Sequence, residues 1–379
     1  MNILISSSRA PVTLELIRAF GRAGHAVYAA DTQPWTLGSH SRYLRRHIVT
    51  PSPRHDPHGF ITALEDVIGA ARIDWLIPTC EEVFWIARFH ARLAEQTRVY
   101  TSPLEQLAEL HHKYRFQQRA AALGLRTPET MLLRSACDLR AALRRFPAYL
   151  LRPVYSRFAT RIVTNCGPRA DRLPLTACQP SPDQHWLAQE YIAGETVCTY
   201  STLHRGRVTA HCAYATPYKV NHGSGVQFVT IDGAPTLALV QRLGAALGYT
   251  GQLALDLLQS ADGLYLLECN PRATSGVHLL SADQLIGGLT DPNQPTAVAP
   301  PGRSGQLAIP LLTSVLREPQ RWPAALQALR RHGDVIIDRA DPLPALIQLR
   351  MALHIIRLSV AHRRSLTAAT TYDIEWNGE

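Results

Sequence analysis

Lysine is almost absent from this sequence. Of the 39 basic residues only two are lysines, Lys113 and Lys219, and the other 37 are arginines. A bias of this size reflects the composition of the genome more than selection at each position. A chain that nearly always uses arginine can still retain lysine where a compact ammonium group is needed. The two lysines are therefore candidates for functional positions.

Paired cysteines are absent as well. The seven cysteines are odd in number, none has CxxC spacing, and no two are close enough to form half of a zinc site. This argues against a disulfide framework and a structural zinc ion, and we expect reduced, mostly buried thiols in a cytoplasmic protein. The cysteines are Cys80, Cys137, Cys166, Cys178, Cys198, Cys212 and Cys269.

Long apolar runs are also missing. No stretch of about 18 uncharged apolar residues occurs, which argues against a membrane span. The N-terminus, MNILISSSRAP, lacks the basic and apolar regions of a signal peptide. With 46% hydrophobic and 18% charged residues, the composition is that of a soluble globular protein. The length of 379 residues predicts two or three packed domains.

The formal net charge of +9 does not indicate a nucleic-acid partner. The arginines are spread along the whole chain, and no segment combines a dense basic run with interleaved aromatic residues. The charge therefore predicts a solvated surface and an affinity for an anionic substrate.

The first 105 residues alternate strand and helix patterns. Short apolar strands are predicted at 3–6, 26–31, 73–79 and 98–102, with helical segments between them. This alternation predicts a parallel, doubly wound sheet. The first turn is SSSRAP and not GxGxxG, so the pyrophosphate fingerprint of a dinucleotide-binding domain is missing. A nicotinamide-dependent oxidoreductase is a weaker alternative for that reason.

The next 180 residues predict an α+β region. The sequence SPLE at 102–105 is a capping box with proline at the first helical position, and the helix that it starts contains Lys113 and ends at Gly124. Strands and one helix, at about 235–247, follow before a hairpin at 251–270. The strands are predicted at 148–153, 159–164, 186–192, 196–204, 207–215 and 225–231.

The last 80 residues differ in character. Residues 295–305 have the composition of a linker, and residues 343–364 form a strongly apolar helical pattern that carries arginines. A membrane or partner helix is one interpretation of this pattern. Arginines and His354 interrupt the apolar positions, so we expect the helix to pack on the body of the protein.

The hairpin carries the most informative pattern of polar residues. Residues 261–263, Ala-Asp-Gly, predict a three-residue hairpin loop, because the glycine can take the left-handed position. Pairing outward from Ser260 and Leu264 places Asp256 opposite Glu268, and Asn270 lies on the same face two residues later. Two carboxylates that meet repel each other unless a cation lies between them. Hard oxygen ligands with room for phosphate and water suit Mg²⁺.

The residues that follow strengthen this interpretation over an ordinary solvent-facing hairpin. Pro271 ends the strand, so Arg272 is projected onto the end of the sheet beside the two acids. A guanidinium in that position is suited to bind a phosphate or a carboxylate.

The motif ECNPR at 268–272, with Asp256 upstream, resembles the E-x-N-x-R metal-binding signature of the ATP-grasp superfamily. The resemblance covers residues 1 to about 285, and NPRATSGVHLL is similar to uncharacterised carbamoyl-phosphate-synthetase-like members. It implies an α/β and α+β architecture in four parts. These are a Rossmann-like pre-ATP-grasp domain (1–105), an ATP-grasp N-lobe (106–185), a C-lobe with the metal site (186–290) and a largely helical C-terminal extension (291–379).

The resemblance also implies roles at the metal and phosphate sites. Asp256, Glu268 and Asn270 would hold one or two Mg²⁺ ions, with Mn²⁺ as an alternative. Arg272 would contact the acyl phosphate or the substrate. Lys113, on a helix like the family's lysine-bearing one, would touch the nucleotide phosphates. Lys219 would lie in a mobile phosphate-covering segment, to which Gly223 and Gly225 add backbone freedom.

The segment AQEYIAGE (188–195) resembles the hinge strand between the two lobes. The backbone around Gln189, Glu190, Tyr191 and Ile192 would meet the adenine edge, and Glu195 would bind the ribose. In this family the ribose acid often follows the hinge glycine by two residues, a place that Thr196 holds here.

Two further features depart from the family pattern. Arg152 stands where a second lysine is usual, and it keeps the charge but binds phosphate with a planar fork. The loop that follows contains no glycine, so the hydroxyls of Ser156 and Thr160 are candidates to replace backbone contacts. Of the enzymes in this family, a biotin carboxylase is the least consistent with this loop, because its run of glycines is missing here.

Together the residues and the resemblance predict an ATP- and Mg²⁺-dependent ligase that activates a small carboxylate as an acyl phosphate and couples it to an amine. A catalytically inactive ATP-binding sensor or partner subunit is the alternative. Homodimers are common among such enzymes, so a homodimer stays open. Glu81 and Glu82 follow a strand end and are candidates to receive the amine.

Overall fold

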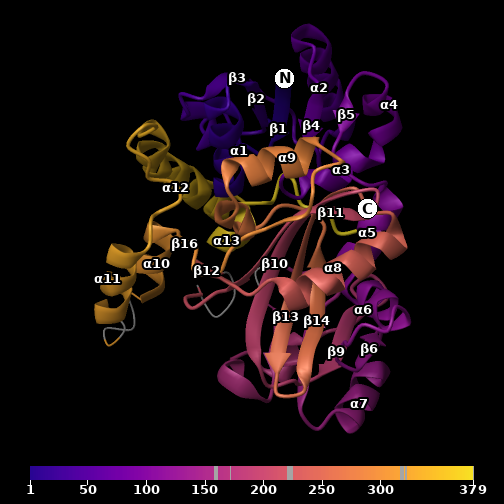
Figure 1. Cartoon of the computed structure of the whole chain (residues 1–379). Coiled ribbons are helices and arrows are strands. Elements are labelled where there is room, and N and C mark those ends of the chain that lie inside the picture. The colour runs from indigo at the N-terminus through magenta and orange to yellow at the C-terminus, as the bar shows by residue number, and fades with distance from the viewer. Residues whose placement is uncertain (158–160, 171, 220–224, 316–319, 321, 379) are drawn as a thin grey trace.

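The computed structural model describes residues 1–157, 161–170, 172–219, 225–315, 320 and 322–378 (Figure 1). Thr160, Gly223 and the start of the predicted strand 159–164 lie outside these ranges. The described residues form three sheets of five, four and seven strands. The mixed α/β and α+β architecture is the one that the sequence predicts.

The first sheet is parallel and doubly wound. Its strand order is β3-β2-β1-β4-β5, and Ile3, Leu4 and Ile5 of the central strand are fully buried because helices cover both faces. Its strands are β1 (Asn2–Ser6), β2 (Ala26–Asp31), β3 (Leu44–Val49), β4 (Trp75–Ile77) and β5 (Arg98–Val99). Its helices are α1 (Pro11–Arg22), α2 (Pro57–Ala71), α3 (Glu82–Arg88) and α4 (His90–Ala94). The pattern did not predict β3, an edge strand that carries two exposed arginines.

The second sheet is antiparallel, in the order β6-β9-β7-β8. Its strands are β6 (Thr130–Leu133), β7 (Tyr149–Pro153), β8 (Val163–Thr164) and β9 (Trp186–Glu190). The helices of this part are α5 (Leu104–His111), α6 (Lys113–Ala122) and α7 (Ala136–Arg145).

The predicted capping box at 102–105 is wrong. The Ser102 hydroxyl bonds both the N–H and the C=O of Thr250 instead of capping a helix, and α5 begins at Leu104. The helix is also interrupted at His112, whose extended backbone and side chain cap a new helix, α6. This break places Lys113 at the first residue of α6.

The third sheet has the strand path β14-β13-β10-β11-β12-β16, and β15 pairs with β11. Its strands are β10 (Glu195–His204), β11 (Arg207–Ala215), β12 (Gln227–Ile231), β13 (Gly251–Ser260), β14 (Gly263–Asn270), β15 (Ala297–Val298) and β16 (Ser304–Gln306). Helices α8 (Ala234–Leu247) and α9 (Ala282–Thr290) pack against β11. The segment after residue 290 therefore contributes two strands to this sheet as well as helices.

The β13–β14 hairpin reaches the expected cross-strand pair by another register. The turn is tighter than predicted, because Ser260 pairs with Gly263 and not with Leu264. A β-bulge then inserts Leu267, so that Asp256 still lies opposite Glu268. The predicted pair is found, although the predicted turn was wrong by one residue.

The C-terminal segment contains α10 (Ala308–Val315), α11 (Trp322–Arg331), α12 (Leu343–Ala361) and α13 (Leu366–Ala369). Its last described residues, 370–378, return to the carboxyl edge of the first sheet, where the ring of Trp376 lies 6.3 Å from that of His111 in α5, centroid to centroid. Asp373 accepts hydrogen bonds from Arg9, and Trp376 stacks on Phe84 with ring centroids 4.8 Å apart. We call residues 370–378 the C-terminal tail.

Helix α12 packs on the body by one face, as the sequence predicts. Ile347 and Met351 pack against a small core formed by Leu14, Leu37 and Ile336. Within the described part of the chain, α12 is also the one helix whose length and composition would allow it to cross a membrane. Only 11% of its apolar window is buried inside the protein.

Candidate active site

Strands β13 and β14 bring the three predicted metal ligands together. Asp256 and Glu268 face each other across the hairpin, and Asn270 Nδ2 donates to Asp256 Oδ2 at 3.2 Å. Burial, together with the charge of Glu268, raises the pKa of Asp256. A site that resists a second negative charge in this way is suited to a cation.

The two predicted phosphate-binding cations reach Glu268 from the other lobe. Lys113 Nζ lies 3.4 Å from Glu268 Oε2 and donates to the Ser156 carbonyl at 2.9 Å. Arg152 Nη1 donates to Glu268 Oε2 at 2.8 Å. Burial opposes ionisation of Glu268, but the charges of Lys113 and Arg152 outweigh it and hold the pKa of Glu268 below its usual range.

The β-bulge supplies Arg152 with a second acceptor. The carbonyl of the inserted Leu267 accepts from Arg152 Nη2 at 2.9 Å and from Gln117 Nε2 at 2.6 Å. Arg152 is therefore held by both a carboxylate and a backbone oxygen, a fork that lysine cannot reproduce.

Lys219 lies on the same side of the third sheet as the metal ligands. Its Nζ donates to Thr196 Oγ1 at 2.8 Å, and the negative charge of Asp256 favours the protonated form of the lysine. Burial lowers the pKa of Lys219. The bond to Thr196 places the lysine at the position where the family pattern expects a ribose acid, whereas Glu195 is exposed at the start of β10.

The predicted hinge residues lie at the end of β9 and just beyond it. The side chain of Gln189 is buried and donates to Thr130 Oγ1 at 3.2 Å. The N–H groups of Glu190 and Tyr191 donate to the carbonyls of Glu129 and Ala148. These two N–H groups are thus engaged within the second sheet.

Arg272 connects the metal ligands to the first sheet. Its Nη2 lies 3.4 Å from Asn270 Oδ1, and its Nε lies 3.5 Å from Glu81 Oε1. Glu81 is almost fully buried and also accepts from Arg157. Burial would raise the pKa of Glu81, but Arg157, His111 and Arg272 lower it to about 2.

Glu82 does not face this site. Its carboxylate accepts from the hydroxyls of Ser6 and Ser7 and from the N–H groups of Thr79 and Cys80. These four hydrogen bonds, at the carboxyl edge of the first sheet, satisfy the Glu82 carboxylate. The expectation that Glu82 receives an amine is therefore wrong, and Glu81 is committed to two arginines.

The sequence interpretation missed Arg157 and the C-terminal tail. Arg157 donates to Glu81, to the carbonyl of Trp376 and to Asn377 Oδ1. The carboxylate oxygen Oε1 of Glu375 accepts hydrogen bonds from Arg54 and from Arg364 Nη1, the latter at 3.1 Å. The acidic and aromatic residues of TYDIEWN, whose Asp373 follows 31 residues without an acid, were the signal that could have revealed them.

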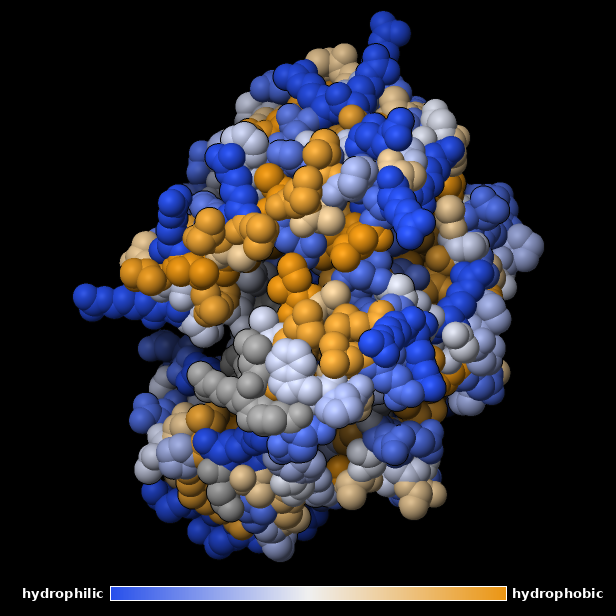
Figure 2. Space-filling model, turned by 90° about the vertical axis from the view of Figure 1, so that its left-hand side faces the viewer, coloured by the Kyte–Doolittle hydropathy of each residue, from blue (hydrophilic) through white to orange (hydrophobic). Residues whose placement is uncertain are grey.

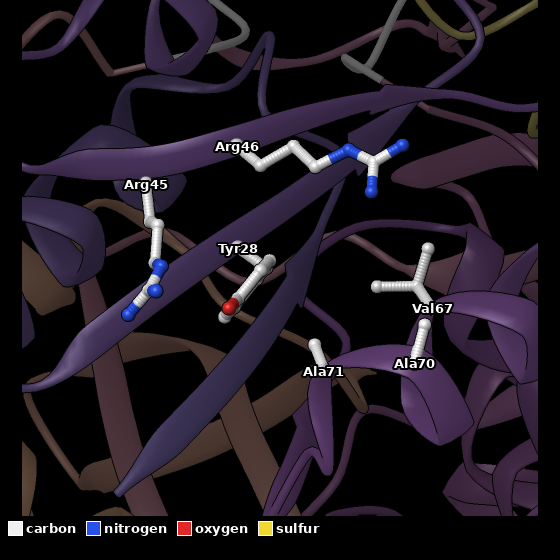
Figure 3. A pocket seen from close by; sticks show the side chains of 6 residues that line it. All are labelled: Tyr28, Arg45, Arg46, Val67, Ala70 and Ala71. Carbon is white, nitrogen blue, oxygen red and sulfur yellow. The ribbon is translucent and has the colours of Figure 1, made fainter.

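A cavity of 540 Å³ lies beside Arg157 and the C-terminal tail, and the lining residues do not include the three predicted metal ligands, Lys113, Arg152 or Arg272. The loop 153–157, the segment 182–185, Arg54 and the tail line it, and its arginines outnumber its acids. A second hollow of 260 Å³, shown in Figure 3, is lined by Tyr28 and two arginines of the β2–β3 region and by α2, and it shares no residue with the site.

No group of three or more His, Cys, Asp or Glu side chains suited to a metal occurs in the described part of the chain. The candidate site differs from such a group because its third predicted ligand is an amide, that of Asn270. Its oxygen donors fit Mg²⁺ better than a transition metal.

No protein-family model and no curated protein matches the chain. Solved structures do match it. The N5-carboxyaminoimidazole synthetase from Staphylococcus aureus, complexed with ADP, has a TM-score of 0.64 and 13% identity, with 85% of this chain and 87% of that chain covered.

Two other solved structures are similar over most of their length. The L-amino acid ligase from Bacillus licheniformis has a TM-score of 0.59 and 15% identity, and the match covers 80% of this chain and 79% of that one. The biotin carboxylase domain of the Hydrogenobacter thermophilus 2-oxoglutarate carboxylase, with MgADP, ADP and bicarbonate, has a TM-score of 0.58 and 12% identity, with 78% and 71% covered.

Proposed function

This chain has the ATP-grasp fold, and we propose that it is an ATP- and Mg²⁺-dependent ligase that couples a small carboxylate to an amine through an acyl phosphate. The observation that carries the proposal is the meeting of Asp256, Glu268 and Asn270 with Lys113 and Arg152 between two lobes. Solved structures with this fold hold ADP and MgADP. The proposal divides the chain at the predicted boundaries near residues 105, 185 and 290.

Asp256, Glu268 and Asn270 would hold Mg²⁺, or Mn²⁺, because they offer hard oxygen donors and a charge that calls for a cation. When bound, the ion neutralises charge that develops on the transferred phosphoryl group.

Lys113 and Arg152 would bind the nucleotide phosphates. Both now contact Glu268, so each is already oriented toward the interlobe space and needs only to share its donors with a phosphate. Lys219 would add a third positive charge next to Thr196. Ile192 N–H is the donor that we assign to the adenine edge, because those of Glu190 and Tyr191 are used within the sheet.

The carboxylate substrate would bind beside Arg272. This guanidinium lies between Asn270 and Glu81, so it can hold an anion close to the ends of the phosphates. Arg272 does not line the 540 Å³ cavity, but Arg157 lines it and donates to Glu81, so we assign this neighbouring space to the remainder of the substrates. Exclusion of water by the closed lobes and the tail would strengthen the charges there.

ADP release tests the proposal. The protein is incubated with Mg²⁺ and ATP against amino acids, dipeptides and small carboxylates, and Glu268→Gln is compared with Glu109→Gln, whose carboxylate pairs with Arg119 at the surface. We expect a substrate-dependent signal that Glu268→Gln lowers at least about 100-fold and Glu109→Gln leaves unchanged. Near-normal turnover by Glu268→Gln would overturn the assignment.

The second candidate is an ATP-binding protein without catalysis. The ion pairs of Glu268 with Lys113 and Arg152 favour it, because they occupy the carboxylate that a metal needs. Tight binding of ATP with no ADP release on any substrate of the panel would support this function over the ligase.

A further inference from the structure

Helix α12 exposes an unbroken stripe of large apolar side chains. The stripe consists of Leu346, Leu349, Leu353, Ile356 and Val360, and their exposed fractions range from 47% to 74%. The face of the molecule in Figure 2 shows such apolar surface bordered by strongly hydrophilic groups. Single exposed leucines need no explanation, but a contiguous row of five marks a docking surface.

The spacing of the stripe is that of one helix face. Its residues follow each other by three and four positions, and the 14 steps from Leu346 to Val360 span about 21 Å at about 1.5 Å per residue. The opposite face of α12 packs on the protein through Ile347 and Met351. The helix is therefore oriented to lie along a surface and not to cross a bilayer.

The charge beside the stripe has one sign. No aspartate or glutamate occurs from residue 342 to residue 372, whereas this segment contains Arg350, Arg357, Arg363 and Arg364. Arg350 and Arg357 directly follow stripe residues and are exposed. The guanidinium of Arg350 lies 3.5 Å from the ring centroid of Trp35, which is itself 42% exposed.

We propose that α12 is a peripheral docking surface for a membrane rich in anionic lipids. An apolar stripe that enters the acyl boundary, flanked by arginines at headgroup level and by an amphipathic tryptophan, is the chemistry of an interfacial helix. The anionic headgroups supply the negative charge that the segment lacks.

A second copy of the chain fits this surface less well. In an antiparallel pair of α12 helices the same flank of each helix would face itself, so that Arg350 and Arg357 would lie near arginines of the other copy. No acidic residue of 342–372 is available to compensate in either orientation.

Vesicle co-sedimentation of the full chain tests the proposal. The vesicles contain either phosphatidylcholine alone or an equal mixture of phosphatidylcholine and phosphatidylglycerol. The wild type is compared with Leu349→Gln/Leu353→Gln, whose changed side chains are exposed, and with the control Val49→Gln/Leu175→Gln. The control changes two exposed apolar side chains outside α12.

We expect binding to the anionic vesicles, weakening in 0.5 M NaCl, and at least about a tenfold loss in the α12 variant but not in the control. Equal sedimentation of the α12 variant and the wild type would overturn the proposal, as would failure of the wild type to bind the anionic vesicles. Light scattering that finds a dimer dissociated by the α12 variant would assign the stripe to a second copy instead. ADP release is independent of all these outcomes.

Discussion

Replacing Glu81 with glutamine is expected to destabilise the protein by about 3.5 kcal/mol at neutral pH. Burial opposes ionisation of this carboxyl, yet Arg157, His111 and Arg272 lower its pKa from 4.5 to about 2. At about 1.4 kcal/mol per pKa unit, this difference gives the stated magnitude. Glu81 is only 2% exposed, so screening by solvent reduces the value little.

The effect has a defined pH dependence. Because the folded-state pKa of Glu81 is lower than the unfolded-state pKa, its stabilisation is present above pH 4.5 and is lost as the pH falls from 4.5 to 2. The difference between wild type and Glu81→Gln should therefore be clearly smaller at pH 3 than at pH 7. Glutamine cannot neutralise the two partly buried guanidinium groups of Arg157 and Arg272, which is the physical reason for the loss at pH 7.

Urea unfolding, followed by tryptophan fluorescence at pH 7, 4.5 and 3, measures this difference. The control is Glu109→Gln, which removes a surface ion pair with Arg119 and is expected to cost less than about 1 kcal/mol. A Glu81→Gln effect no larger than that of the control at pH 7, or one of equal size at pH 3, would refute the reasoning.

Two further predictions concern Arg152 and the tail. Arg152→Lys keeps the positive charge at Glu268 but loses the hydrogen bond to the Leu267 carbonyl, which still accepts from Gln117. We therefore expect Arg152→Lys to raise the KM for ATP by less than about tenfold in steady-state kinetics. Arg152→Met removes the charge as well, and we expect it to raise this KM at least about 100-fold. Trp376→Ala removes a buried ring and should cost about 3–5 kcal/mol in urea unfolding. The exposed Trp35, changed to alanine, serves as its control and should cost far less.

The sequence predicted the cross-strand pair of the β13–β14 hairpin but not how the hairpin is built. The alternation of Asp256, Glu268 and Asn270 was sufficient to place them on one face, because strand periodicity is local. The bulge at Leu267 was not predictable, since its stabilising partners, Arg152 and Gln117, come from other elements. The pairing was correct because the tighter turn and the extra residue compensate each other.

The remaining errors have the same origin. Ser102 has the pattern of a helix cap, yet its hydroxyl bonds Thr250, which is 148 residues away in sequence. Glu82 follows a strand end like a ligand-binding residue, yet local hydroxyls and N–H groups satisfy it. The tail has no periodicity, so its place at the cavity depends entirely on tertiary contacts such as Arg157 with Trp376 and Asn377.

The tail also has a consequence for the order of folding. The Arg9–Asp373 pair joins residues 364 positions apart, among the longest loop closures that a chain of this length can make. Contacts of such separation pay their closure entropy only after the intervening chain is compact. Residues 370–378 should therefore dock last, and protection of their amides in a refolding hydrogen-exchange experiment should appear after that of β1 and β13. The cavity wall that they form would then exist only in molecules in which every other part has already folded.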